Sequence, residues 1–163
     1  MKPTCDLYDE FLDTIGVLPV GLAHFGGRES FHGPAVTVKC FEDNSRIKEL
    51  AGQPGGSRVM IVDAGGSLRC AVLGDVIAGE AAANGWAGII IWGAVRDRRA
   101  LAELDLGVMA LGGIPRKSTR RGEGQTDIAI TLGNTAIAPG DLIVADADGV
   151  LVFPANGPKP DLA

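Results

Sequence analysis

Histidine, cysteine and aromatic residues are scarce in this chain, and basic residues are outnumbered by acidic ones. Only 2 His and 3 Cys occur among 163 residues, and Phe, Trp and Tyr together make up 5%. So few soft ligands, with no Cys-x-x-Cys spacing, argue against a zinc site and against a disulfide framework. The three separate cysteines indicate reduced thiols, as in the cytoplasm. A total of 15 Lys and Arg against 20 Asp and Glu gives a net charge of −5, which argues against direct nucleic-acid binding.

Long apolar runs are missing as well. The longest uncharged apolar stretch, residues 87–95, is far shorter than the roughly 20 residues that a membrane span needs. The first ten residues contain acids instead of a basic segment followed by an apolar one. We therefore expect no secretory signal, no membrane partner and a cytoplasmic protein. The length and the 46% share of hydrophobic residues are typical of a single globular domain.

The middle of the chain predicts strands that alternate with helices. Val59–Asp63 and Ala87–Trp92 are continuous apolar runs, typical of strands buried on both faces. A helix over Asp75–Ala83 lies between them and should end at Asn84–Gly85. The further elements expected here are a strand over 35–40, short helices over 46–51 and 98–104, and a strand over 108–111. This order implies a parallel, right-handed core.

The two ends of the chain have a different character. An amphipathic helix is expected over Asp6–Ile15. Near the C-terminus, short apolar segments at 127–132, 135–138, 142–145 and 150–153 alternate with turn residues, which is typical of antiparallel hairpins. The predicted fold class is therefore α/β, with a parallel α/β half joined to an antiparallel β-rich half. Residues 1–156 are expected to form this single domain, and residues 157–163 a loose C-terminal tail.

Common catalytic motifs are absent: there is no phosphate-binding loop, dinucleotide-binding glycine motif, nucleophile elbow or His-x-x-x-His metal motif. Charged residues instead follow two predicted strands. Asp75 comes after the glycine-rich connection that follows the first strand, and Arg96 and Asp97 come just after the second. Ligands of open α/β sheets bind outside the carboxyl ends of the strands. If the two strands are neighbours, these three side chains converge on one site.

These residue types suit a small dicarboxylate or 2-oxo acid bound through Mg²⁺ or Mn²⁺. An arginine fork binds a carboxylate, a neighbouring aspartate holds a hard cation, and the helix start after Gly74 offers free N–H groups. Two plainer interpretations stay open: Asp75 caps its helix, and Arg96 and Asp97 form a surface ion pair. The basic segment Arg116–Arg121 is either a flexible loop or one that approaches an acidic substrate or another subunit.

Ten short motifs occur in order along nearly the whole chain. They are Phe25–Arg28, Thr37–Asn44, Val62–Arg69, Leu73–Asp75, Gly93–Asp97, Asp105–Gly107, Pro115–Ser118, Gly122–Gly124, Pro139–Asp141 and Ala145–Gly149. Because of these motifs and their order, the chain resembles the RraA-like family, which is named for the regulator of ribonuclease E activity A. The family also contains class II 4-hydroxy-4-methyl-2-oxoglutarate/4-carboxy-4-hydroxy-2-oxoadipate aldolases. The resemblance implies a swivelling β/β/α-type fold and a homotrimer, in some members a dimer of trimers, with sites between subunits.

The resemblance also implies roles for particular residues. The aldolase branch carries Asp-x20-Arg-Asp, and here twenty residues separate Asp75 from Arg96, with Asp97 next. Members that regulate the ribonuclease often lack the second aspartate. Carried over residue by residue, the resemblance implies substrate contacts at Gly74, Asp75, Val76, Ile77 and Arg96, catalytic roles for Asp75 and Arg96, and a divalent metal at Asp97. Some dedicated aldolases have additional C-terminal structure at the site, which this sequence does not show.

The implied activity is a metal-dependent lyase that forms a pyruvate enolate. It would cleave 4-hydroxy-4-methyl-2-oxoglutarate or 4-carboxy-4-hydroxy-2-oxoadipate to pyruvate and decarboxylate oxaloacetate, since both reactions share the enolate. The metal and Arg96 would stabilise that enolate, and Asp75 would serve proton transfer. The alternative is a regulator that binds ribonuclease E without touching RNA and needs neither metal nor Asp97. A third interpretation is a ligand-binding protein without turnover.

Overall fold

Four parallel strands form the centre of the fold. The structure is a computed structural model that describes all residues, 1–163. The central strands are, in spatial order, β3 (Phe31–Lys39), β4 (Val59–Asp63), β6 (Gly88–Val95) and β7 (Gly107–Gly113). The sheet continues antiparallel beyond β3 through β11 (Leu142–Asp146), β12 (Gly149–Phe153) and β1 (Gly16–Val17), and beyond β7 through β2 (Ala23–His24). The predicted mixed α/β fold with a parallel core is confirmed.

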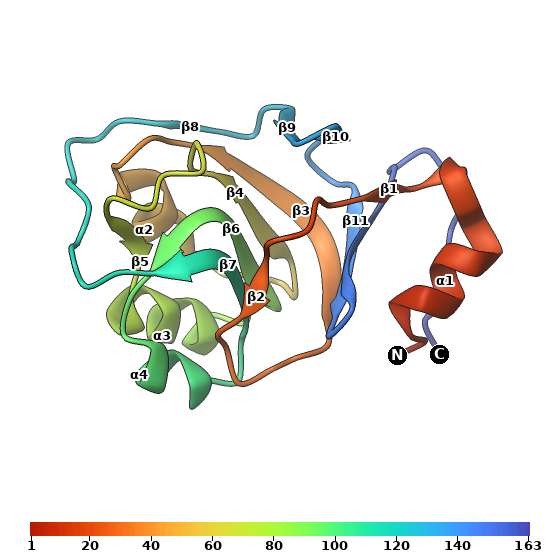
Figure 1. Cartoon of the computed structure of the whole chain (residues 1–163), viewed down its shortest axis with the longest axis horizontal. Helices are drawn as coiled ribbons and strands as arrows, with labels where there is room; N and C mark the ends of the chain where they lie inside the picture. The colour runs from red at the N-terminus through yellow and green to blue at the C-terminus, as the bar shows by residue number, and fades with distance from the viewer.

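Side chains of the central strands alternate between two buried layers. Met60, Val62 and Ile91 face the first layer, which packs against three helices. These helices are α2 (Ser45–Ala51), α3 (Asp75–Ala83) and α4 (Arg98–Ala102), and they lie together on one side of the sheet (Figure 1). Ile61 and Ile90 face the second layer, beneath the hairpin β9 (Ile130–Leu132) and β10 (Thr135–Ile137). Burial on both faces explains why the strand sequences are continuous apolar runs.

The N-terminal helix is shorter than predicted. Helix α1 spans Thr4–Phe11 and is followed by a 3-10 turn, η1, over Leu12–Thr14. The backbone at Leu12 has a φ of 47°, which an α-helix cannot contain, so the apolar pattern continues past the end of the helix. α1 packs against β11 and β12, where Leu162 joins the same apolar cluster. The two chain ends therefore lie close together (Figure 1).

Other details also differ from the sequence prediction: β3 begins at Phe31 and not at residue 35, and β6 continues past residue 92 to Val95. The strand expected over 127–132 begins only at Ile130, because Asp127 has a φ of 61° and interrupts the extended backbone. No hairpin joins β10 to β11, since β11 pairs with β3 and β12 instead. The helix expected over 98–104 ends at Ala102. None of the helices is long and apolar enough to span a bilayer.

Candidate active site

A short strand brings the two predicted halves of the site together. β5 (Ala71–Leu73) lies parallel to the second half of β6, with Leu73 opposite Val95. The residues that follow these strands, Gly74–Asp75 and Arg96–Asp97, therefore emerge side by side at one edge of the sheet. The backbone N–H of Arg96 donates to the carbonyl of Leu73 at 2.9 Å and fixes this register. The structure thus brings together all three expected side chains, but through β5, which was not predicted.

Asp97 lies at the centre of this arrangement. Its backbone has a φ of 58°, in the left-handed region that Asp tolerates better than most residues. Its carboxylate Oδ2 accepts the backbone N–H of Asp75 at 3.1 Å and Nε of Arg96 at 3.4 Å. No hydrogen bond in the structure reaches the other oxygen, Oδ1. One oxygen of Asp97 therefore orients the start of α3 and Arg96, and the other is available to a ligand.

The first turn of α3 tests the two plainer interpretations, that Asp75 caps the helix and that Arg96 and Asp97 form a surface ion pair. The N-cap residue of α3 is Gly74, which has no side chain, and the capping oxygen comes from Asp97. The interpretation of Asp75 as the cap is therefore wrong, and its exposed carboxylate is left for other chemistry. Arg96 and Asp97 do form an ion pair, as the second plain interpretation held, but within the site.

Gly74 is required by the closeness of its neighbours. A Cβ atom at this position would lie 2.6 Å from Oδ2 of Asp97 and 3.2 Å from Cγ of Arg96. Its φ of −135° is open to any residue, so side-chain space and not backbone conformation demands glycine here. The expected substrate contacts Val76 and Ile77 follow in the first turn, where backbone N–H groups have no partner within the helix.

The electrostatics keep Asp97 ionised. The hydrogen bond from the Asp75 N–H holds the pKa of the Asp97 carboxyl below its usual value. Partial burial opposes this downward shift of the pKa, and the side chain of Asp75 and the nearby charge of Arg96 add to it. Asp97 is therefore a carboxylate at neutral pH, as a ligand for a hard cation must be.

A pocket of about 690 Å³ opens above these residues. It is lined by Asp75, Arg96 and Asp97 together with Gly74, Val76 and Ile77, and further by Asn44, Ala71, Leu73, Lys117, Ser118, Thr119 and Arg120. All of the site residues expected from the sequence therefore border it. Three cationic side chains face two carboxylates, a balance that suits an anionic ligand. A second hollow of about 640 Å³ lies across the same three charged residues, next to α4.

Two interpretations of the basic segment Arg116–Arg121 stay open from the sequence, and the structure places its residues Lys117–Arg120 against this pocket. Backbone bridges attach it at two points, Ala71 with Lys117 and Asp43 with Thr119. Asn44, Ser118 and Thr119 were not singled out as site residues. Asn44 has a sequence signal only through its place in the motif Thr37–Asn44, and Ser118 and Thr119 mainly through the basic segment Arg116–Arg121, because the bridges join segments far apart in the chain.

A divalent cation fits this site only if most of its ligands come from outside the protein. No cluster of three or more His, Cys, Asp or Glu side chains that could hold a metal ion exists in the structure. Asp97 offers an oxygen without a hydrogen bond, and Asp75 lies beside it. Mg²⁺ keeps several waters and is often bound through one or two carboxylates plus the substrate. The residues present therefore fit Mg²⁺ or Mn²⁺ bound jointly with a chelating ligand.

Comparisons with known proteins give matches that cover almost the entire chain. A family model described as RraA-like (Aldolase/RraA) matches residues 4–152. A protein of Alcanivorax borkumensis, provisionally named 4-hydroxy-4-methyl-2-oxoglutarate aldolase, is 51% identical over 93% of this chain and 95% of its own length. The solved structure of the RNA-processing inhibitor RraA from Thermus thermophilus has a TM-score of 0.92 at 37% identity, over 99% of this chain and 97% of that one. A Geobacillus kaustophilus structure described as an S-adenosylmethionine:2-dimethylmenaquinone methyltransferase has a TM-score of 0.90 at 40% identity, with the same coverage of 99% and 97%.

Proposed function

We propose that this chain, which belongs to the RraA-like family, is a lyase dependent on a divalent cation. Its substrates would be 4-hydroxy-4-methyl-2-oxoglutarate or 4-carboxy-4-hydroxy-2-oxoadipate, cleaved to release pyruvate, with decarboxylation of oxaloacetate as a second activity of the same site. Relatives that are provisionally named as this aldolase support the substrate class.

One observation carries the proposal: Asp75, Arg96 and Asp97 converge on one pocket that Lys117 and Arg120 also line. A guanidinium and two carboxylates at the edge of a parallel sheet can bind a 2-oxo acid at one end and stabilise charge at the other. Lys117 and Arg120 give a second anionic group of the substrate a place to bind. A small diacid therefore matches the pocket better than a neutral ligand does.

Three groups of residues in the chain would have separate roles in the reaction. Arg96 binds the carboxylate or carbonyl oxygen of the 2-oxo acid and stabilises the enolate that remains when the C–C bond breaks. The first-turn N–H groups of Val76 and Ile77 bind the substrate carboxylate. Asp75 accepts the proton of the 4-hydroxyl group, directly or through a water molecule, and returns a proton to the enolate carbon. In oxaloacetate, CO₂ leaves in place of the second carbonyl product, and the same enolate takes its proton from a water molecule, because this substrate has no 4-hydroxyl proton to transfer.

Asp97, with Asp75 beside it, would hold the cation. When bound, Mg²⁺ or Mn²⁺ supplies Lewis-acid stabilisation of negative charge on the 2-oxo acid oxygens. No lysine would be needed to form a Schiff base with the substrate, because a bound cation and Arg96 would together stabilise the negative charge of the enolate.

The test is pyruvate release from oxaloacetate by the purified protein with Mg²⁺. Free divalent cations decarboxylate oxaloacetate slowly, so a chelator control and the Asp97→Ala variant set the background. We expect turnover above that background in the natural protein, with loss of at least about 100-fold in the variant. Turnover that persists in Asp97→Ala contradicts the proposal. Positive results justify assays with the two 4-hydroxy-2-oxo acids.

The second candidate is a protein-binding regulator of ribonuclease E. It is favoured by one observation, the close structural match to the RNA-processing inhibitor RraA. Such a role would use the acidic surface of the chain instead of the pocket, and it needs no cation. Inhibition of ribonuclease E that survives Asp97→Ala and a chelator, in a chain without turnover, supports this candidate against the lyase.

A further inference from the structure

The segment that carries the cationic wall of the pocket is held from behind by a buried carboxylate. Asp43 is fully buried and lies in the connection between β3 and α2. Its Oδ1 accepts the N–H of Ser45 at 2.9 Å and the hydroxyl of Ser45 at 2.6 Å. Its Oδ2 accepts the backbone N–H of Arg121 at 2.6 Å, the residue next to the pocket-lining Arg120.

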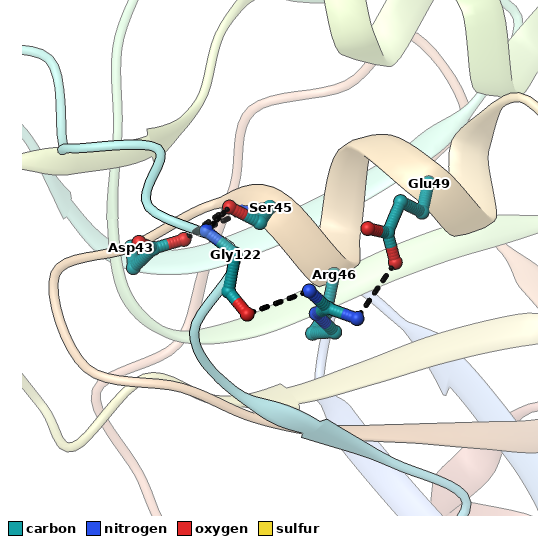
Figure 2. Close-up of polar contacts among 5 residues, drawn as sticks. All are labelled: Asp43, Ser45, Arg46, Glu49 and Gly122. Atoms are coloured by element: carbon teal, nitrogen blue, oxygen red, sulfur yellow. Dashed lines mark hydrogen bonds and ion pairs between the residues drawn. The ribbon is translucent and has the colours of Figure 1, made fainter.

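Ser45 completes the attachment, as Figure 2 shows. Its Oγ accepts the backbone N–H of Gly122 at 2.8 Å, and Arg46 donates to the carbonyl of Gly122 at 2.7 Å. We call the side chains of Asp43 and Ser45, with the two N–H groups of Arg121 and Gly122, the Asp43 latch. Neither side chain of the latch lines the pocket.

A carboxylate is specifically required at position 43. Burial alone would raise the pKa of Asp43, but hydrogen bonds from Ser45, Arg121 and Glu123 outweigh it, so the pKa lies below its usual value. Each oxygen faces only donors. An asparagine has the same shape but must turn its NH₂ group toward one of these donors, which breaks one side of the latch.

We infer that Asp43 and Ser45 are positioning residues for ligand binding: through Arg121 and Gly122 they anchor the end of the Lys117–Arg120 segment and so keep it at the pocket without touching the ligand. The inference rests on the proposed function for the identity of the ligand. It concerns the remote anionic group of that ligand, because Lys117 and Arg120 are the cations proposed to bind that group, whereas the reacting end lies at Asp97. A loosened latch should therefore weaken binding of a diacid and leave the chemical step nearly unchanged.

Two non-reacting ligands test this inference independently of turnover. 2-Oxoglutarate has the 2-oxo acid group and a remote carboxylate but no 4-hydroxyl group to cleave, and oxalate has no remote carboxylate. Titration calorimetry with Mg²⁺ would measure both in the natural protein, Asp43→Asn, Ser45→Ala and the control Glu49→Ala. Glu49 pairs with Arg46 at 3.1 Å but does not contact the Lys117–Gly122 segment. Amide exchange over residues 117–122 would report the latch directly.

We expect both latch variants to weaken 2-oxoglutarate binding about tenfold, to change oxalate binding less than about twofold, and to speed amide exchange in the segment. For oxaloacetate, KM should rise by a similar factor while kcat stays within about threefold. The control should match the natural protein. Unchanged 2-oxoglutarate affinity, equal loss for both ligands, or a natural protein that binds no 2-oxoglutarate overturns the inference. If Asp43→Asn does not fold, Ser45→Ala decides alone. Failure of oxaloacetate turnover would refute the lyase only, since the calorimetry does not depend on it.

Discussion

Replacing Gly74 with alanine should damage the site without disturbing the backbone. The new methyl carbon would lie 2.6 Å from Oδ2 of Asp97, well inside van der Waals contact. The backbone at Gly74 accepts alanine, so the carboxylate is the group that has to rotate away. That rotation breaks the hydrogen bond to the Asp75 N–H and releases Arg96 from its partner.

The expected loss of stability follows from the hydrogen bond between Asp97 and the Asp75 N–H that Gly74→Ala breaks. A helix cap contributes about 1 kcal/mol, and we expect Gly74→Ala to destabilise the fold by about that amount. Gly79→Ala is the matched control, because Gly79 lies inside the same helix and a Cβ there meets nothing within 4 Å. It should stabilise the fold by about 0.5–1 kcal/mol through the lower backbone entropy of alanine. The two variants should thus differ by about 2 kcal/mol, or roughly 4–8 °C in Tm for a chain of this size.

Thermal denaturation and oxaloacetate turnover measured side by side test this reasoning. Gly74→Ala should lose about 100-fold in kcat/KM because Arg96 and Asp97 are both misplaced, whereas Gly79→Ala should keep its activity. In an Asp97→Ala background, Gly74→Ala should add little further loss of stability, because the colliding oxygen is gone. Equal behaviour of the two alanine variants, or full additivity with Asp97→Ala, would refute the steric argument.

Three further predictions concern the rest of the molecule. Burial raises the pKa of the Cys40 thiol to about 12, so the unfolded chain ionises first, near pH 8.5. In urea titrations, the Cys40 thiol should lower the free energy of unfolding by about 1.4 kcal/mol per pH unit between pH 8.5 and about 12. Cys40→Ala should remove that part of the slope and leave the parts that come from Cys5 and Cys70, whose pKa values are also raised. Asp146 accepts the N–H and hydroxyl of Thr4, each at 2.7 Å, so Asp146→Ala should lower stability by about 2 kcal/mol and expose α1 to proteolysis; equal cleavage rates contradict this. The chain is predicted to form a homotrimer or a dimer of trimers, so light scattering should give a mass three or six times that of one chain. A mass equal to one chain would refute this prediction.

The parallel core could be predicted because its signal is local. Val59–Asp63 and Gly88–Val95 are buried on both faces, so nearly every residue in them is apolar, and the turn at Asn84–Gly85 marks the helix end. β5 could not be predicted in the same way. It has only three residues, and its existence depends on β6 extending past the end of β4, which no pattern within Ala71–Leu73 reveals.

The sequence predicted which residues form the site but not the hydrogen bonds that connect them. Asp75, Arg96 and Asp97 stood out as charged residues that follow strands, and the topology then brought them together. That Asp97 would cap the helix of Asp75 depends on a contact across the sheet edge, between residues 22 positions apart. The hydrogen bond from the Arg121 N–H to Asp43, at the end of the Lys117–Arg120 segment, joins residues still further apart. Such contacts leave no periodic trace in the sequence.

Relatives of this chain share one fold but are described by different activities, so the fold cannot decide between them. The decision depends on whether Asp97 acts as a structural cap or as a charged ligand, and Asp97→Asn separates the two. The amide oxygen of asparagine can still accept the Asp75 N–H, so the Tm should stay within about 2 °C of the natural protein. The negative charge is lost, so turnover and Mg²⁺ dependence should disappear as in Asp97→Ala. Full turnover in Asp97→Asn would mean that Asp97 serves only to orient α3 and Arg96, and that the cation, if one is used, is held elsewhere.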